Sequence, residues 1–297
     1  SATDLGVGVQ HGKAVRMQGF VGPLAGLNGN SPALAITGAE ARSLVDGRVL
    51  VAFEAAGGLA MAVGEAATSK EEIVFEAAAG GTLVASVGAE EAFDVLGIEA
   101  PALLLDAPDG LQRLYYSGQG EQGWQIGLMT SSDGDSWTRV GEDGLVLGTG
   151  PAGSWDDFSV RSPTVLWDSQ SSLFRMWYVG SDGEQTRIGH ASSADGLSWQ
   201  RHLDPSGVGT WVFDGAELPF VGGSALSPSV AVRGDGSLEM WFEGQLNGVA
   251  RLGRARSDDG ISWAAITNPT TAGDSFTLTT RSGDDVPGSG IHLGDDA

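Results

Sequence analysis

The chain has 297 residues, a formal net charge of −22 and no cysteine. A chain of this length can bury a sizeable core, and its strong negative charge makes nucleic acid and anionic membranes poor partners. The lack of cysteine excludes disulfides and thiolate metal sites, and no apolar run reaches the roughly 18 residues of a membrane-spanning helix. Because the chain begins at Ser1, we expect a secreted, periplasmic or cell-surface protein whose targeting signal has been removed.

Four similar segments each begin with a proline that opens a short apolar run, at Pro32, Pro101, Pro163 and Pro228. Successive prolines are 69, 62 and 65 residues apart. Short apolar runs bounded by turn residues are typical of buried strands, and proline fits the first position of a strand. We therefore predict inner strands that start near these four prolines.

Each predicted inner strand is followed by a turn and by two further strand-like runs. In the last three repeats a motif close to S-x-D-G-x-S-W then follows, at 131–137, 193–199 and 257–263. The motif resembles the Asp-box turn of sialidases. We expect its Asp to accept hydrogen bonds from turn amides, its Gly to take unusual backbone angles and its Trp to pack between sheets.

A period in the sixties with four short strands per repeat is typical of β-propeller blades. The four repeats leave roughly half a period at the two ends. We therefore predict one all-β domain over 1–297, a five-bladed β-propeller with four-stranded antiparallel blades. The fifth blade would take its inner strand from a run at Gly290 and outer strands from runs at Leu5 and Ala14, which closes the ring. A four-bladed ring with an N-terminal extension is the alternative.

The best repeat reads Trp155-Asp156 through Pro163, then 176–180 (MWYVG), then 188–199 (IGHASSADGLSW). This order resembles the five-bladed propellers of glycoside hydrolase families 43, 62, 32, 68 and 130, over about residues 93–263. The resemblance implies hydrolysis of a plant or microbial polysaccharide or oligosaccharide by acid/base chemistry. It also implies three carboxylates around a central funnel: a general-base Asp, an Asp that tunes the pKa of the acid, and a general-acid Glu.

Glu99 is the residue that matches the general acid, because it stands two positions before Pro101 as Glu-x-Pro. The alternative is an ion pair with Arg161, which holds the same position in the next repeat and is also a candidate substrate-binding residue. No inner strand carries Asp-Pro, so the base has no match at its expected position. Asp94 and Asp156, in the loops that enter repeats two and three, are candidates for the base or for sugar ligands. Capping a turn or linking blades is the alternative for both.

Other candidates come from the second strands, the loops and the C-terminus. Glu243 and the equivalent Glu54 could line the funnel as a carboxylate pair, or could bond backbone amides between blades. Trp155 and Trp211 fall in or beside loops, where their rings could stack on sugars. His292 lies beside an acidic C-terminal run whose oxygens suit calcium, which makes it a candidate calcium ligand. The alternative is an acidic terminus without a ligand. We expect no cofactor to be required.

Two functions therefore stand side by side. One is a carbohydrate-active enzyme that binds a glycan or small sugar and cleaves a glycosidic bond. The other is a non-catalytic propeller that binds glycan or protein, as part of the cell surface or the secreted fraction. A propeller that serves only as a rigid surface module is a third, because a fold alone does not confer an activity.

Overall fold

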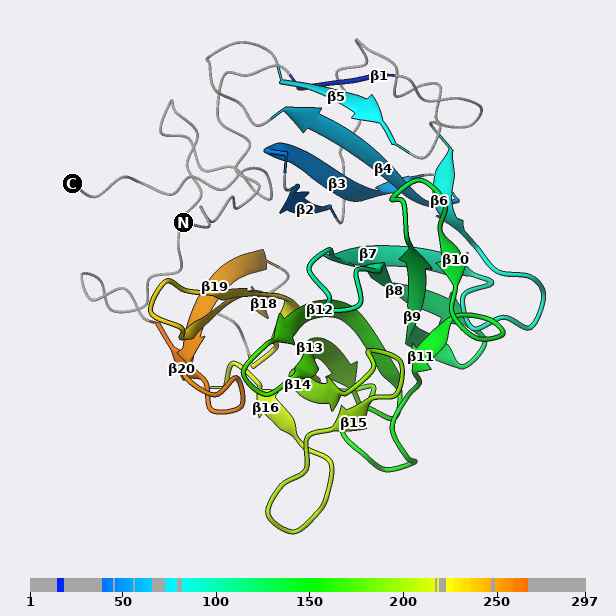
Figure 1. The fold of residues 1–297 in the computed structure, drawn as a ribbon. Coiled ribbons are helices and arrows are strands. Elements are labelled where there is room, and N and C mark those ends of the chain that lie inside the picture. Colours follow the sequence, from blue (N-terminus) through cyan, green and yellow to red (C-terminus); the bar gives the residue numbers. More distant parts are fainter. Residues whose placement is uncertain are drawn as a thin grey trace.

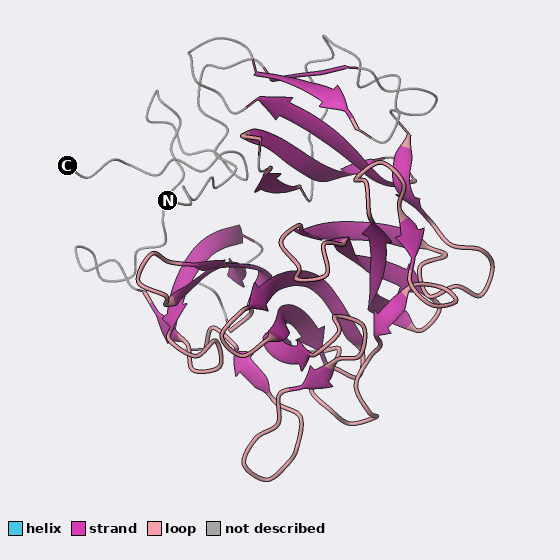
Figure 2. Cartoon of the chain, in the orientation of Figure 1, coloured by secondary structure: helices cyan, strands magenta, loops and turns pink. Residues whose placement is uncertain are grey.

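The computed structural model describes residues 15–18, 39–44, 46–55, 57–65, 73–78, 82–216, 218, 223–246 and 249–266. These residues form strands, turns and loops without a helix, as Figure 2 shows. No helix in this part of the chain is long and apolar enough to cross a membrane. The strands make four sheets that stand side by side around a common centre in a β-propeller arrangement (Figure 1).

The blades follow one another in chain order. The first contains β1 (Val15–Gln18), β2 (Glu40–Ser43), β3 (Arg48–Ala55), β4 (Gly58–Glu65), β5 (Ile73–Ala77) and β6 (Leu83–Ser86). The second contains β7 (Gly97–Leu104), β8 (Gln112–Gly120), β9 (Gly123–Ser131), β10 (Thr138–Arg139) and β11 (Leu145–Leu147). The third contains β12 (Ser159–Asp168), β13 (Leu173–Ser181), β14 (Thr186–Ser193), β15 (Gln200–Arg201) and β16 (Trp211–Phe213). The fourth contains β17 (Leu226–Val232), β18 (Leu238–Leu246), β19 (Val249–Ser257) and β20 (Ala264–Ala265).

The core lies between consecutive blades. One buried cluster joins blades one and two, a second joins blades two and three, and a third joins blades three and four. The second strand of a blade is therefore covered on both faces. This explains why β13 (LFRMWYVGS) reads as a nearly continuous apolar run and why β8 is buried along most of its length, since a strand covered on both sides loses the usual alternation of buried and exposed residues.

The three S-x-D-G-x-S-W motifs form tight turns, as predicted. In the second blade, Asp133 Oδ1 accepts the N–H groups of Asp135 and Ser136 at 2.9 and 2.8 Å, and Trp137 Nε1 donates to the carbonyl of Gly134 at 3.0 Å. Gly134 has a φ of 82°, which favours glycine. The bonds from the amides lower the pKa of Asp133 to about 2. These aspartates are occupied by their own turns.

The turns also join successive blades. Tyr115 on β8 donates its hydroxyl to the carbonyl of Gly196 in the next blade at 3.0 Å. Trp177 on β13 donates Nε1 to the carbonyl of Gly260 in the blade after that at 2.8 Å. Both rings are fully buried. The second strand of one blade is thus bonded to the motif turn of the next.

The blade count differs from the prediction, because the described residues form four blades and not five. β1 was expected in the fifth blade, and this is wrong: Val15–Gln18 pairs in parallel with β5 at the outer edge of the first blade. The expected runs at Leu5, Pro32 and Gly290 lie outside the described residues. In the first blade, the strand that pairs with β3 on the inner side is β2.

Candidate functional site

Pro101, Pro163 and Pro228 lie inside β7, β12 and β17 and not at their first residue. In β7, β12 and β17 the pairing register shifts at the proline, as in a β-bulge. The residue directly before the proline has a positive φ in each strand: 51° at Ala100, 50° at Ser162 and 48° at Ser227. Such backbone is strained by about 1–3 kcal/mol in a residue other than glycine, and strain of this kind gathers at functional sites. The three bulges therefore occupy equivalent places on the inner strands of blades two, three and four.

A bulge leaves the N–H of its extra residue without a partner in its own sheet. Here the preceding blade supplies the acceptor. Ala100 N–H donates to Glu54 Oε1 on β3 at 3.0 Å, and Ser162 N–H donates to Ser117 Oγ on β8 at 2.8 Å. Glu54 thus bonds a backbone amide between blades, as the second of its two interpretations predicted.

Glu99 and Arg161 stand immediately before these strained residues, on neighbouring blades. Arg161 Nη1 lies 3.7 Å from Glu99 Oε1, and about a third of each side chain is exposed (33% for Glu99 and 34% for Arg161). The predicted ion pair is therefore present. A pair this exposed contributes at most about 1 kcal/mol, so hydroxyl groups of a ligand can replace either partner at little cost.

The surroundings of Glu99 favour its protonated form. Burial raises the pKa of Glu99, the charge of nearby Glu54 raises it further, and Arg161 lowers it in part. Glu54, Glu99 and Arg161 come from three successive blades, and we refer to them as the funnel cluster. The inner strands that carry Glu99 and Arg161 lie toward the middle of the ring (Figure 1). The cluster combines a carboxyl group with a raised pKa, a second carboxylate and a cation.

Asp94 and Asp156 occupy equivalent sites that are closed to solvent. Asp94 Oδ2 accepts from Tyr116 Oη at 3.1 Å and from Arg139 Nη2 at 2.7 Å. Both the tyrosine and the arginine belong to the same blade as the aspartate that they bind. The side chain of Asp94 is fully buried.

The same network recurs one blade later. Asp156 Oδ2 accepts from Tyr178 Oη at 3.0 Å and from Arg201 Nε at 2.8 Å, and Asp156 is 1% exposed. Burial raises the pKa of Tyr178, so this phenol remains a donor. The geometry favours the structural alternative for Asp94 and Asp156, and a catalytic role for either stays a prediction. These arginines were not identified from the sequence, although one signal was available: each arginine follows its aspartate by 45 residues.

Trp155 and Trp211 are brought together. Their ring centroids are 6.3 Å apart at 67°, and Trp155 also stacks on Tyr178 at 5.7 Å. Both tryptophans line a surface cleft of about 480 Å³ on the third blade. Its other lining residues are Gly153, Ser154, Asp157, Asp182, Arg187, Val208 and Gly209. We call this the blade-3 cleft.

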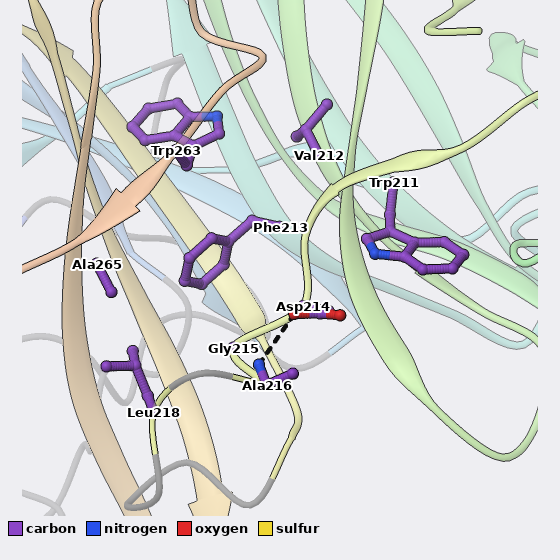
Figure 3. Close-up of a pocket in the computed structure, with 9 residues that line it drawn as sticks. All are labelled: Trp211, Val212, Phe213, Asp214, Gly215, Ala216, Leu218, Trp263 and Ala265. Atoms are coloured by element: carbon purple, nitrogen blue, oxygen red, sulfur yellow. Dashed lines mark hydrogen bonds between the residues drawn. The ribbon is translucent and has the colours of Figure 1, made fainter. Parts of the chain in front are cut away.

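Trp211 also borders a second hollow of about 240 Å³, between the outer strands of blades three and four. Figure 3 shows its lining, with Phe213, Leu218 and Trp263 among the larger side chains. The carboxylate of Asp214 is bound there to the N–H of Ala216 at 2.9 Å, drawn as the dashed line. Asp214 is the charged residue in this lining.

The remaining candidates are not joined to these groups. Glu243 lies opposite Leu226 in the fourth blade, and its Oε1 accepts from Gln245 Nε2 at 3.3 Å. His292 lies outside the described residues. Within the described part of the chain, no three His, Asp or Glu side chains are grouped closely enough to hold a metal ion together.

Comparison with known proteins identifies the fold more firmly than the activity. No protein-family model matches the chain. The A type blood N-acetyl-alpha-D-galactosamine deacetylase of Flavonifractor plautii is 31% identical over 110 residues, which are 36% of this chain and 14% of that enzyme. This chain therefore matches a small part of that curated relative.

Solved structures match over most of the chain. The endo-arabinase of Bacteroides thetaiotaomicron superposes with a TM-score of 0.61 at 13% identity, covering 89% of this chain and 96% of that one. A family 117 glycoside hydrolase of the marine bacterium Zobellia galactanivorans gives a TM-score of 0.56 at 13% identity, over 80% and 72%. A thermostable family-43 glycoside hydrolase gives 0.54 at 15% identity, over 80% and 76%.

These comparisons define the class of protein: the chain is a β-propeller with the fold of glycoside hydrolases. The resemblance found in the sequence is confirmed at the level of fold, since families 43 and 130 are among the structural neighbours.

Proposed function

We propose that the chain is a carbohydrate-active propeller that hydrolyses a glycosidic bond of a neutral glycan held at the funnel cluster. The observation that carries this proposal is Glu99. It is a partly exposed carboxyl on an inner strand, with a pKa raised by burial and by Glu54. A carboxyl group with a raised pKa beside a second carboxylate is a usual arrangement for a catalytic acid and its base.

In this mechanism Glu99 gives its proton to the oxygen of the departing sugar as the glycosidic bond breaks. Glu54 takes a proton from the water that attacks the anomeric carbon, so one water molecule is consumed for each bond cleaved. Arg161 releases Glu99 and binds sugar hydroxyls. Glu54 replaces Asp94 and Asp156 in the role of base, because the charge of Glu54 acts directly on Glu99.

The test is turnover of a panel of neutral polysaccharides: arabinan, xylan, mannan and fructan. The panel also includes an oligosaccharide that ends in N-acetylgalactosamine, the sugar named for the deacetylase relative. Reducing ends released by the wild type are compared with those released by Glu99→Gln. We expect Glu99→Gln to lower turnover at least a thousandfold with an unchanged melting temperature. Glu121→Gln, an exposed carboxylate in the same blade, is the matched control.

A non-catalytic glycan-binding propeller is the second candidate. It is favoured by the 3.7 Å approach of Arg161 to Glu99 and by the bond from Ala100 N–H to Glu54, which occupy both carboxylates. Binding of a panel member without any product from the wild type would establish this candidate in place of the hydrolase. Turnover by Glu99→Gln equal to that of the wild type would remove Glu99 from the mechanism.

We also propose that the complete propeller has five blades, as the resemblance to families 43 and 130 implies. The support is the coverage of the endo-arabinase chain, which is nearly complete. A secreted or cell-surface location fits a protein that meets polysaccharides, and cell fractionation tests it.

A further inference from the structure

The blade-3 cleft lies on the same end of the propeller as the funnel cluster. Across the third blade, Arg161 pairs with Val179 on β13, and the neighbouring Gly180 pairs with Arg187 on β14. Arg187 lines the cleft. Two strand spacings separate β12 from β14, which is about 10 Å of backbone. A ligand chain leaving the funnel outward over blade three therefore meets the cleft at once.

Phe158 stands between the two sites in the sequence, one residue after Asp157 of the cleft, and is unusually exposed, at 64%. It immediately precedes β12 and stands three residues before Arg161. Its backbone is fixed, because Phe158 N–H donates to the carbonyl of Ser181 at 3.0 Å. A Cβ on Gly183 would stand 3.6 Å from the Phe158 ring, so the ring lies beside the β13–β14 hairpin. A large part of the ring surface is open to solvent.

A glycine in the β8–β9 hairpin of the second blade also lies against Phe158. A Cβ on Gly123 of the second blade would lie 2.8 Å from the carbonyl oxygen of Phe158, and Gly123 has a φ of 89°. Leu96 holds the equivalent position in the second blade and is 62% exposed. Two successive blades therefore present a large apolar side chain at the same place on the rim.

The cleft itself combines an aromatic ring with polar groups. Trp211 is 38% exposed, and the guanidinium of Arg187 lies 4.3 Å from its ring centroid. Arg187 also pairs with Asp182 at 3.0 Å. Amide and guanidinium bonds lower the pKa of Asp182 to about 2, so it is an ionised acceptor. Asp157 is a second carboxylate in the lining.

This lining fits a neutral sugar. Aromatic rings bind the apolar face of a sugar, whereas carboxylates and a guanidinium bind its hydroxyls. Two carboxylates against one guanidinium, in a protein of net charge −22, disfavour an acidic glycan.

We propose that the blade-3 cleft is a second carbohydrate-binding site, which Phe158 connects to the funnel, so that one neutral glycan chain of several residues occupies both. The inference rests on the proposed function, since the funnel supplies the first site. It defines the substrate class as a polysaccharide or long oligosaccharide and not a single sugar.

The test is the length dependence of binding, measured by titration calorimetry. The probes are linear oligosaccharides of one to six residues from the arabinan, xylan, mannan and fructan series. We expect the wild type to bind longer members more tightly. Phe158→Ala and Trp211→Ala should each lose about tenfold in affinity for the hexamer, with a loss that shrinks as the chain shortens. Leu197→Ala, an exposed apolar residue in the motif turn at the other end of the third blade, is the control.

The outcomes separate the two proposals. Equal affinity of the wild type and Phe158→Ala at every length would overturn the second site while leaving the funnel intact. A wild type that binds no member of any series would overturn the proposed function and this inference with it. Because Trp211 packs on Trp155, the affinities of Trp211→Ala are interpreted only if its melting temperature equals that of the wild type. Phe158→Ala removes an exposed ring, so this variant is sufficient for the test by itself.

Discussion

Replacement of Asp156 by Asn decides whether this residue is part of the structure or of the chemistry. The substitution removes the charge that three donors share: Tyr178 Oη, Arg201 Nε and Ser154 Oγ, at 3.0, 2.8 and 3.0 Å. Breaking a buried ion pair from one side costs roughly 3–5 kcal/mol, because the other charge remains unpaired. The side chain of Arg201 is 21% exposed and recovers some hydration, so we expect a loss of about 2–3 kcal/mol.

The assay is unfolding in urea followed by tryptophan fluorescence. With an m value near 3 kcal/mol per molar, the midpoint should fall by about 0.7–1 M. Asp157→Asn is the control, since the Asp157 carboxylate accepts a bond from Gly153 N–H at the surface and should cost less than about 0.5 kcal/mol. An unchanged midpoint for Asp156→Asn would refute the structural assignment. If glycan turnover were lost at the same time, Asp156 would be the base.

Two further predictions concern protonation. Burial, and to a smaller extent the charge of Arg175, lower the pKa of His190 from 6.5 to about 3. Between these pH values His190 binds a proton in the unfolded chain but not in the folded chain. The free energy of unfolding should therefore fall as the pH drops from 6.5 toward 3, by up to about 1.4 kcal/mol per pH unit. In urea titrations at several pH values, His190→Gln should show a smaller dependence on pH. Equal pH dependence in the wild type and the variant would contradict this prediction. Since the charge of Glu54 raises the pKa of Glu99, Glu54→Gln should lower that pKa in a carbon-13 titration of the Glu99 carboxyl. An unchanged pKa would show that the two groups do not interact.

The repeat pattern was enough to predict the strands of blades two to four and the motif turns. Both depend on local signals, namely apolar runs bounded by turn residues and a seven-residue motif. The parallel pairing of β1 with β5 has no such signal, because its partners are far apart in sequence and no short turn sets their register. This is why Val15–Gln18 was assigned to the wrong blade.

The site could be predicted only in part, for a related reason. Equivalent positions before Pro101 and Pro163 showed that Glu99 and Arg161 face each other, and the 3.7 Å pair follows from that symmetry. Arg139 and Arg201, the partners of Asp94 and Asp156, lie on short outer strands 45 residues further along the chain, and only the repeat of that spacing links each arginine to its aspartate. Phe158 gave no signal, because exposure depends on the hairpins of two blades, which meet only in the fold.

The bond from each second strand to the next motif turn has a consequence for how such proteins change in number of blades. Tyr115 to Gly196 and Trp177 to Gly260 are contacts of one kind, in which unlike surfaces meet head to tail. Interfaces of this kind do not themselves limit the number of units, and the rotation from one unit to the next determines when the ring closes. A gene duplication that adds one repeat therefore supplies a donor and an acceptor together and leaves every existing contact usable. The number of blades in this architecture can therefore change during evolution without a new type of interface between blades.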